Sequence, residues 1–319
     1  MIIGLHDAEK DYFRHGKIFP NYALMKISAW HKSKGDQVEW WNPLYRYDLV
    51  YSSKVFDFTQ DDPYLPTDAI RGGTGYIDIP IDHKLPQKID DMFPDYSTYP
   101  ECDYAIGYLT RGCIRKCRWC VVPRKEGHIG PYRDWTEIVR KDTDKLVLMD
   151  NNILACEYGI RQLESLIGSG YHIDLNQGMD ARLVTPEVAE ILSRLSWIRF
   201  IRFSCDQKSQ IEPIRRTVEL LRKYGVRPYR IFIYLLVTQD IEDAAERVEA
   251  LRHYTGINLY AQAERNDRMG IIPNHEQLEF SQRYIYSGCY RVEAWKEYCA
   301  RRNLNFKENI NERKDFEGD

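Results

Sequence analysis

The sequence predicts an α/β protein, namely a partial (β/α)6 TIM-like barrel that follows a small Rossmann-like α/β domain. Three observations predict this class. From Tyr104 onward, six short apolar runs rich in β-branched and aromatic residues follow one another. Stretches with helical periodicity separate these runs, which is the pattern of parallel βα units. A unit of different pattern precedes them, in a chain of 319 residues that is 43% hydrophobic and 29% charged, as in globular proteins.

The Rossmann-like domain is predicted over residues 1–78. Its expected elements are a strand at residues 1–7, an amphipathic helix at 21–35, strands at 38–41 and 47–56, and a glycine-rich turn at 70–76. Residues 79–100 contain four prolines and several acidic residues, which is typical of a linker along the surface between domains.

The barrel is predicted over residues 101–265. Thr185 and Pro186 are typical of a helix start, and Gly225 is typical of a helix end. Six units are too few for a closed barrel of eight strands, so an open barrel fits the count. Residues 266–319 are expected to form a C-terminal extension with a frayed polar tail. The expected strands are residues 104–110, 145–150, 171–176, 198–204, 229–237 and 257–263.

Charge and hydropathy limit the functional classes. The net charge of -3 does not favour a general polyanion binder. The longest apolar run, near residues 231–237, is far shorter than the roughly 20 residues of a membrane span. The first residues lack the pattern of a signal peptide. We therefore expect a cytoplasmic protein without membrane contact, whose eight cysteines are thiols or metal ligands rather than disulfides.

Three of these cysteines, Cys113, Cys117 and Cys120, lie directly after the first predicted barrel strand. Parallel α/β barrels carry their reactive groups at the carboxyl ends of the strands, so a site is expected there. Three thiolates at this CxxxCxxC spacing can hold three irons of a [4Fe-4S] cluster. The fourth iron then lacks a protein ligand and is open to a substrate or cofactor.

With the aromatic residue Trp119 before the last cysteine, residues 101–265 resemble the radical S-adenosyl-L-methionine (SAM) superfamily. The resemblance implies that SAM binds the open iron and that the reduced cluster cleaves it. The resulting 5′-deoxyadenosyl radical then abstracts a hydrogen from the substrate. It also implies an electron donor such as flavodoxin or ferredoxin. The protein's part is binding, orientation and shielding.

Two other interpretations of the cysteines remain open. His128 could complete a structural zinc site with the same three thiols, or the cysteines could be close by chance. The loop is also rich in cations, which could offset the negative charge of a cluster, meet a reductase or a substrate phosphate, or simply be solvated. These cations are Arg111, Arg115, Lys116, Arg118, Arg124 and Lys125.

Polar residues at later strand ends are candidates for SAM binding. Asp150, Asn151 and Asn152 occupy the place of the family's Gly-Gly-Glu-like stretch, although the glycines are missing and Asp150 could instead cap a helix. The further candidates are Gln177, Asp180 and Arg182 after the third strand, and Arg202 with Asp206 as its expected partner at the fourth, because an arginine inside a barrel strand is costly unless paired. Asp180 and Arg182 could also be a structural ion pair. Gln262, Glu264 and Arg265 are expected on the substrate side.

The remaining cysteines, at positions 102, 156, 205, 289 and 299, are too scattered to predict a second cluster, and buried thiols are expected. The stretch "AIRGGTGY" resembles the Gly-Gly turn of cobalamin-binding domains, but the Asp-x-His-x-x-Gly motif is absent. We therefore expect no bound cobalamin and a degenerate domain for packing or substrate docking. The first cysteine is Cys102, so the N-terminal cysteine set of tRNA methylthiotransferases is absent too.

These observations together favour a radical SAM enzyme whose substrate stays open. The 23 tyrosines and the basic stretch at residues 214–230 would tolerate a nucleotide or nucleic acid, and a small metabolite or a peptide is also compatible. A cobalamin-dependent methyltransferase is the alternative within the family. A binding module stabilised by zinc or by a cluster, without catalysis, is the alternative from another class.

Overall fold

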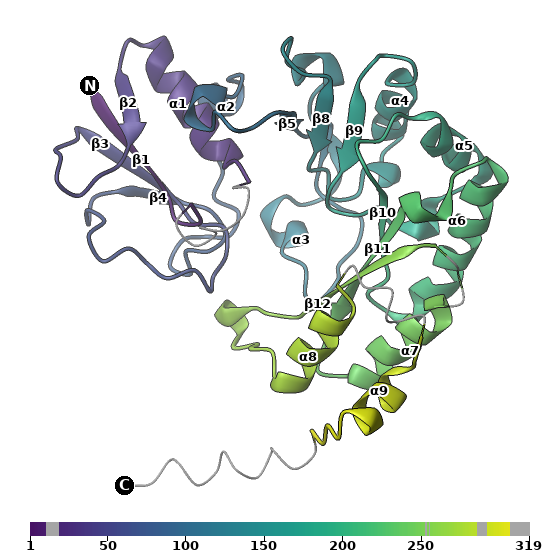
Figure 1. Cartoon of the computed structure of the whole chain (residues 1–319). Coiled ribbons are helices and arrows are strands. Elements are labelled where there is room, and N and C mark those ends of the chain that lie inside the picture. Colours follow the sequence, from purple (N-terminus) through teal and green to yellow (C-terminus); the bar gives the residue numbers. More distant parts are fainter. Residues whose placement is uncertain (11–18, 253, 255, 286–291, 307–319) are drawn as a thin grey trace, which may run out of the picture. The chain divides into compact units, whose positions relative to one another are not determined.

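The computed structural model describes residues 1–10, 19–252, 254, 256–285 and 292–306. It is a mixed α/β structure with parallel sheets, as the sequence predicts (Figure 1). The chain divides into two compact units, Met1–Ile173 with Asn266–Gly270, and Asp174–Arg265 with Ile271–Asp319. This division falls within the predicted barrel, and the boundaries expected from the sequence stay predictions.

The N-terminal part contains a four-stranded sheet in the order β2-β1-β3-β4, with every neighbouring pair parallel. This is the strand order with which flavodoxin-like doubly wound sheets begin. The two connections after β2, at residues 41–48 and 54–69, contain no helix. The elements are β1 (Ile2–Asp7), α1 (Tyr22–Ser33), β2 (Gln37–Trp40), β3 (Leu49–Ser53) and β4 (Ile70–Gly72).

The helix α1 covers this sheet. The side chain of Asn21 accepts a hydrogen bond from the Leu24 amide and so caps the helix start. Ile3 and Leu5 of β1 are buried against apolar residues of α1, among them Leu24 and Ile27. Alternate strand residues and helix residues three apart thus supply one small core.

The glycine-rich segment 70–76 differs from the prediction of a simple turn, because it begins with the short strand β4. Gly73 has a φ of +98°, and a Cβ on it would lie 2.2 Å from the Lys54 carbonyl oxygen. The glycine is therefore required because the turn crosses the chain that leaves β3.

The segment expected as a linker, residues 79–100, contains the short helices α2 (Gln87–Asp90) and η1 (Tyr96–Thr98). Ile89 joins the core under β1. Lys26 of α1, with a side chain only 1% exposed, donates from Nζ to the Asp90 carboxylate at 3.0 Å and to the Tyr132 hydroxyl at 3.1 Å. Burial lowers the pKa of Lys26, which Asp90 partly offsets. This segment is thus packed and ion-paired.

All six strands expected after residue 100 are present, so this part of the prediction is confirmed. One sheet has the order β5-β8-β9 and another the order β10-β11-β12. An isolated parallel bridge joins Met179, just after β9, to Phe203 of β10. The strands are β5 (Ala105–Gly107), β8 (Lys145–Leu148), β9 (His172–Leu175), β10 (Ile201–Ser204), β11 (Ile231–Val237) and β12 (Asn258–Ala263).

The helices after residue 150 are α4 (Glu157–Ser165), α5 (Pro186–Arg194), α6 (Ile211–Lys223), α7 (Ile241–Arg252), α8 (His275–Arg283) and α9 (Trp295–Arg301). Thr185 caps α5 by accepting from the Val188 amide, as expected. Helices α5 to α7 lie on one side of β10–β12 in Figure 1. Residues 307–319, most of the tail that was expected to fray, lie outside the described residues. No described helix combines the length and the apolar character that a membrane crossing requires.

Replacing Gly73 with alanine should lower the free energy of unfolding by at least about 3 kcal/mol, because the new Cβ meets a backbone atom that cannot move aside. Gly35→Ala is the matched control. Gly35 also has a positive φ, of +83°, but no atom lies within 4 Å of its Cβ position, so only the backbone cost of about 1–2 kcal/mol remains. Chemical denaturation of both variants measures the difference, and equal losses would contradict the close crossing.

Candidate functional site

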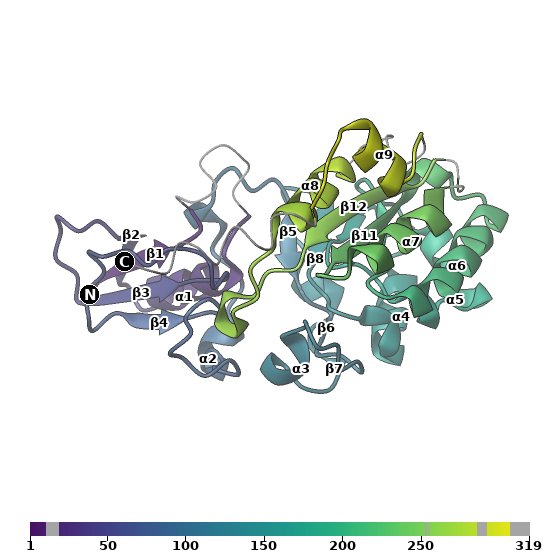
Figure 2. The same cartoon turned by 90° about the horizontal axis from the view of Figure 1, so that it is seen from below.

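The three motif cysteines lie in a loop that a short antiparallel ladder closes. The ladder consists of β6 (Thr110–Arg111) and β7 (Gly130–Pro131), and the loop contains the helix α3 (Val122–Lys125) (Figure 2). Gly112 has a φ of +93°, and a Cβ on it would lie 2.4 Å from the His128 carbonyl oxygen. The Cys113 amide donates to the Gly127 carbonyl at 3.1 Å. The start of the loop is therefore held against its end.

Cys113, Cys117 and Cys120 form no disulfide bond and are partly buried. Sγ of Cys113 accepts hydrogen bonds from the Arg115 amide at 3.3 Å and from Nδ2 of Asn152 at 3.5 Å. Within the described part of the chain, the Asn152 carbonyl Oδ1 is buried without a hydrogen-bond partner. Sγ of Cys113 is therefore held by donors from its own loop and from the turn after β8.

Within the described residues, no three His, Cys, Asp or Glu side chains are arranged to hold a metal ion. The chemistry of the donor set nevertheless fits an iron–sulfur cluster, because three cysteines share one cation-rich loop and Sγ of Cys113 already accepts two N–H groups. The imidazole of His128 is exposed, and its Nδ1 lies 3.1 Å from the Ile129 carbonyl oxygen. Its use as a zinc ligand stays an untested alternative.

The loop cations fall into different environments. Arg111 pairs with Glu126 at 2.7 Å, and its guanidinium lies over the Tyr108 ring at 4.1 Å. Arg118 lies over the ring of Trp119 at 5.7 Å. Lys116 and Arg124 are exposed, and burial lowers the pKa of Lys125. Arg111 is therefore part of the loop's own structure, while Lys116 and Arg124 face solvent.

Asp150 lies at the carboxyl end of β8, where the sequence places it, and is only 3% exposed. Its carboxylate accepts hydrogen bonds from the Leu109 amide at 3.1 Å and from the amide and hydroxyl of Thr110 at 2.5 and 2.7 Å. Burial raises the pKa of Asp150 to about 6, although these hydrogen bonds oppose the shift. Asp150 braces the chain entering the cysteine loop, and the next helix, η3 (Ile153–Ala155), has Asn152 as its N-cap residue instead.

Glu126 is a residue that the sequence analysis did not single out. Its side chain is 7% exposed, and its Oε2 accepts from the Gly112 amide at 2.9 Å and from Nδ2 of Asn151 at 2.8 Å. Together with the Arg111 pair, these contacts join both ends of the cysteine loop to the turn after β8. Only the position of a lone glutamate among six cations could have pointed to it.

In the second unit, Asp180 and Arg182 form the ion pair that was considered as a structural alternative. Nε and Nη2 of Arg182 lie 2.7 and 3.0 Å from the two carboxylate oxygens of Asp180. Asp180 also accepts from the Arg182 amide and so caps the helix η4 (Ala181–Leu183). Gln177 is exposed, and its side-chain amide Nε2 donates to Oδ1 of Asn176 at 3.2 Å.

Arg202 forms an ion pair with Asp174 of β9, a partner that the sequence analysis did not name. The expected partner, Asp206, lies beyond the end of β10, and its carboxylate accepts from the Leu236 amide of β11 at 3.0 Å. The difference arises because Asp206 lies past the end of β10, where its carboxylate binds the backbone of β11, whereas Asp174 of β9 lies within reach of Arg202. Burial raises the pKa of Asp206.

Of the residues expected near the substrate, Gln262 and Arg265 are exposed and Glu264 is buried. Among the scattered cysteines, Cys102 and Cys205 are buried, as expected, while Cys156 and Cys299 are partly buried. Burial raises the pKa of Cys205 to about 12, so it is an inert thiol. Cys289 lies outside the described residues.

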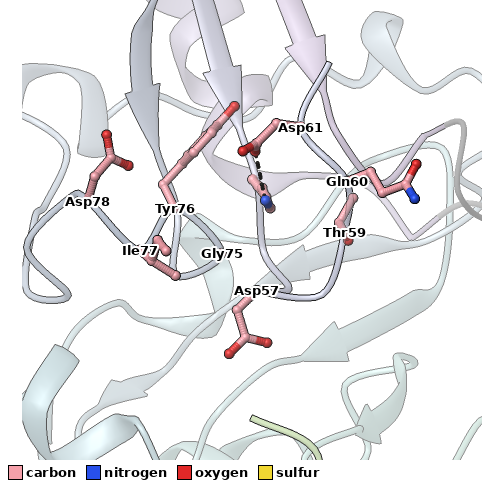
Figure 3. A pocket seen from close by; sticks show the side chains of 9 residues that line it. Asp57, Thr59, Gln60, Asp61, Gly75, Tyr76, Ile77 and Asp78 are labelled. Carbon is pink, nitrogen blue, oxygen red and sulfur yellow. Dashed lines mark hydrogen bonds and ion pairs between the residues drawn. The ribbon is translucent and has the colours of Figure 1, made fainter. Parts of the chain in front are cut away.

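The N-terminal domain has a cavity of about 250 Å³ at the carboxyl ends of β3 and β4 (Figure 3). Its lining combines three carboxylates with Lys54, which pairs with Asp61 at 2.7 Å. The volume lies below the roughly 300–1,000 Å³ of typical small-molecule pockets. Nearby, the Glu9 carboxylate accepts from the amides of Val55 and Phe56 and from the Thr59 hydroxyl. The lining residues are Lys54, Asp57, Thr59, Gln60, Asp61, Gly75, Tyr76, Ile77 and Asp78.

Comparison with known proteins adds no further assignment: no family model matches the chain, and no curated protein sequence is significantly similar to it.

The raised pKa of Asp150 predicts a pH dependence of stability. Below pH 3.8 the carboxyl is neutral in both the folded and the unfolded chain. As the pH rises from 3.8 through about 6, the unfolded chain ionises first, so the free energy of unfolding falls by about 3 kcal/mol. Asp150→Asn should remove this slope. Denaturant titrations of both proteins between pH 4 and 7 test the prediction, and parallel curves would contradict it.

Proposed function

We propose that the chain is a radical SAM enzyme built on an open, partial (β/α)6 barrel. The observation that carries the proposal is the set of Cys113, Cys117 and Cys120 in one closed loop that follows β5, with N–H donors on Sγ of Cys113. The order of strands supports it, because β5, β8, β9, β10, β11 and β12 follow the chain and alternate with helices.

In this proposal the three cysteine thiolates hold a [4Fe-4S] cluster. When bound, the cluster and SAM supply the reductive cleavage that yields a 5′-deoxyadenosyl radical for hydrogen abstraction from the substrate. The chain's own residues bind and orient. Asn152 donates to Sγ of Cys113, and Asp150 fixes the amides of Leu109 and Thr110 before the loop.

For SAM, the proposed contacts are the polar residues at the strand ends, with Arg182 and Arg202 as the cations for its carboxylate. Both arginines already lie beside an acid, Asp180 and Asp174 respectively, which fixes their orientation. A flavodoxin or ferredoxin is the proposed electron donor and the cytoplasm the proposed location. The substrate class is open, with a nucleotide or nucleic acid as one option. We further propose that the N-terminal domain serves packing or docking rather than cobalamin binding.

The direct test is anaerobic reconstitution with iron and sulfide, followed by addition of SAM and a strong reductant. The proposal expects 5′-deoxyadenosine and methionine as products. Protein that holds iron but forms no 5′-deoxyadenosine under these conditions would count against radical chemistry. Tightly bound zinc with no iron in anaerobically purified protein would instead favour the non-catalytic alternative.

Alanine at Cys113, Cys117 or Cys120 should abolish iron retention after reconstitution and desalting, because each thiolate holds one iron. The matched control is Cys156→Ala, which removes a partly buried cysteine outside the motif and should leave the iron content unchanged. Iron and sulfide analysis provides the measurement. Equal iron retention by the motif variants and the control would exclude the proposed ligands.

Arg182→Ala and Arg202→Ala should each weaken SAM binding by roughly 10- to 150-fold, which is the loss of one charge-assisted hydrogen bond. The iron content should stay that of the parent. Arg194→Ala, at an exposed position of α5, is the control. Equilibrium dialysis with reconstituted protein measures the affinities, and parent-like binding by both variants would show that the SAM residues lie elsewhere.

A further inference from the structure

We propose that Glu126 is a positioning residue that holds the cysteine loop in its ligand-ready arrangement before any cofactor binds. The inference rests on the proposed function for the purpose of the loop, while the hydrogen bonds that carry it are formed by the chain's own residues. One carboxylate joins three segments. Its Oε1 accepts from Nη2 of Arg111 at 2.7 Å, and its Oε2 accepts from the Gly112 amide at 2.9 Å and from Nδ2 of Asn151 at 2.8 Å.

The three hydrogen-bond donors lie at the start of the cysteine loop and in the turn beside it. Arg111 and Gly112 directly precede Cys113, and Glu126 follows Cys120 by six positions, so the carboxylate ties the beginning of the loop to its end. Asn151 belongs to the turn after β8, whose next residue, Asn152, donates to Sγ of Cys113. Removing the carboxylate therefore removes the side-chain link between the two ends of the loop and the turn, and leaves the backbone bonds of the ladder and of the Cys113 amide.

The site requires a carboxylate rather than any polar side chain. All three partners are N–H donors, and an ionised carboxylate is the side chain that accepts at both oxygens and donates nothing. In glutamine an NH2 group replaces one carboxylate oxygen. This NH2 group would face an N–H donor of Arg111, Gly112 or Asn151, and that donor would lose its acceptor. The Arg111 guanidinium is itself fixed over the rings of Tyr108 and Tyr132, at 4.1 and 5.4 Å, so it cannot follow a displaced partner at no cost.

The test measures how fast iodoacetamide labels Cys113 in apo protein, with Cys156 of the same molecules as the internal reference and peptide mass spectrometry as the readout. Loss of one or two charge-assisted bonds predicts that the Cys113 to Cys156 ratio rises at least about tenfold in Glu126→Gln. The matched control is Glu137→Gln. Glu137 also accepts from one backbone amide, that of Asp134, and from one arginine, Arg133, but it touches no part of the cysteine loop.

A double variant separates positioning from general stability. In Glu126→Gln with Asn151→Asp, the contact between the two side chains is restored with donor and acceptor exchanged, so part of the Cys113 protection should return. A residue that merely stabilises the fold would not be rescued in this way. If Glu126→Gln does not fold by circular dichroism, Asn151→Ala removes a single donor and should still raise the ratio, by a smaller factor.

Iron retention of the same variants after reconstitution gives the second readout, with a reduced yield expected for Glu126→Gln and a parent-like yield for Glu137→Gln. A folded Glu126→Gln protein whose Cys113 reacts as slowly as in the Glu137→Gln control would overturn the proposal. The labelling result holds even if the parent protein binds no iron, in which case the proposed function fails and the positioning of the loop stands.

Discussion

A buried carboxylate needs hydrogen-bond donors, and the chain around the cysteines supplies them from its own backbone. Asp150 receives the amides of Leu109 and Thr110 before the loop, and Glu126 receives the Gly112 amide inside it. Three of the four amides of residues 109–112 are therefore held by two acids from different parts of the chain. The path into the cysteine loop is determined by these acids as much as by the two-residue ladder of β6 and β7.

This arrangement also explains why the strand ends carry so many polar residues without each one having to touch a ligand. Arg247, whose side chain is fully buried, donates to the carbonyls of Cys205 and Leu236 and pairs with Asp243. Asp206 accepts the Leu236 amide at the same strand end. The ends of β10 and β11 thus have their own backbone groups satisfied by side chains. A polar residue at such an edge is evidence for a ligand only where its hydrogen bonds within the protein leave a donor or acceptor available.

The elements whose signal is local could be predicted from the sequence. The six later strands and α5 follow from apolar runs, a Thr-Pro start and glycine stops, all of which lie within a few residues of each other. The strand β4 was not predicted, because three residues next to glycines carry no periodicity. The partner of Arg202 was misassigned, because a neighbour four residues away in sequence looked closer than Asp174 on the adjacent strand.

Glu126 could not be predicted for the same physical reason, since its role depends on which backbone amides the fold brings to it. The motif cysteines, in contrast, are recognisable because their chemistry is contained in their spacing. The roles expected for Asp150 and Asp180 rested on position along the chain, and the structure adds what each acid contacts. Both hold nearby backbone amides.

The contacts of the loop cations show which of them are paired, which are buried and which face solvent. The sequence left open whether the six cations offset the charge of a cluster, meet a partner or are solvated, and the structure shows that Arg111 pairs with Glu126 and that burial lowers the pKa of Lys125. Lys116 and Arg124 face solvent, where water and salt screen them. Sγ of Cys113 itself accepts from two neutral N–H groups, the Arg115 backbone amide and the Asn152 side-chain amide. Fixed dipoles at hydrogen-bond distance depend less on ionic strength than mobile surface charges do. The electrostatics of this site therefore follow from the loop's backbone geometry, which is the feature that Glu126 and Asp150 maintain.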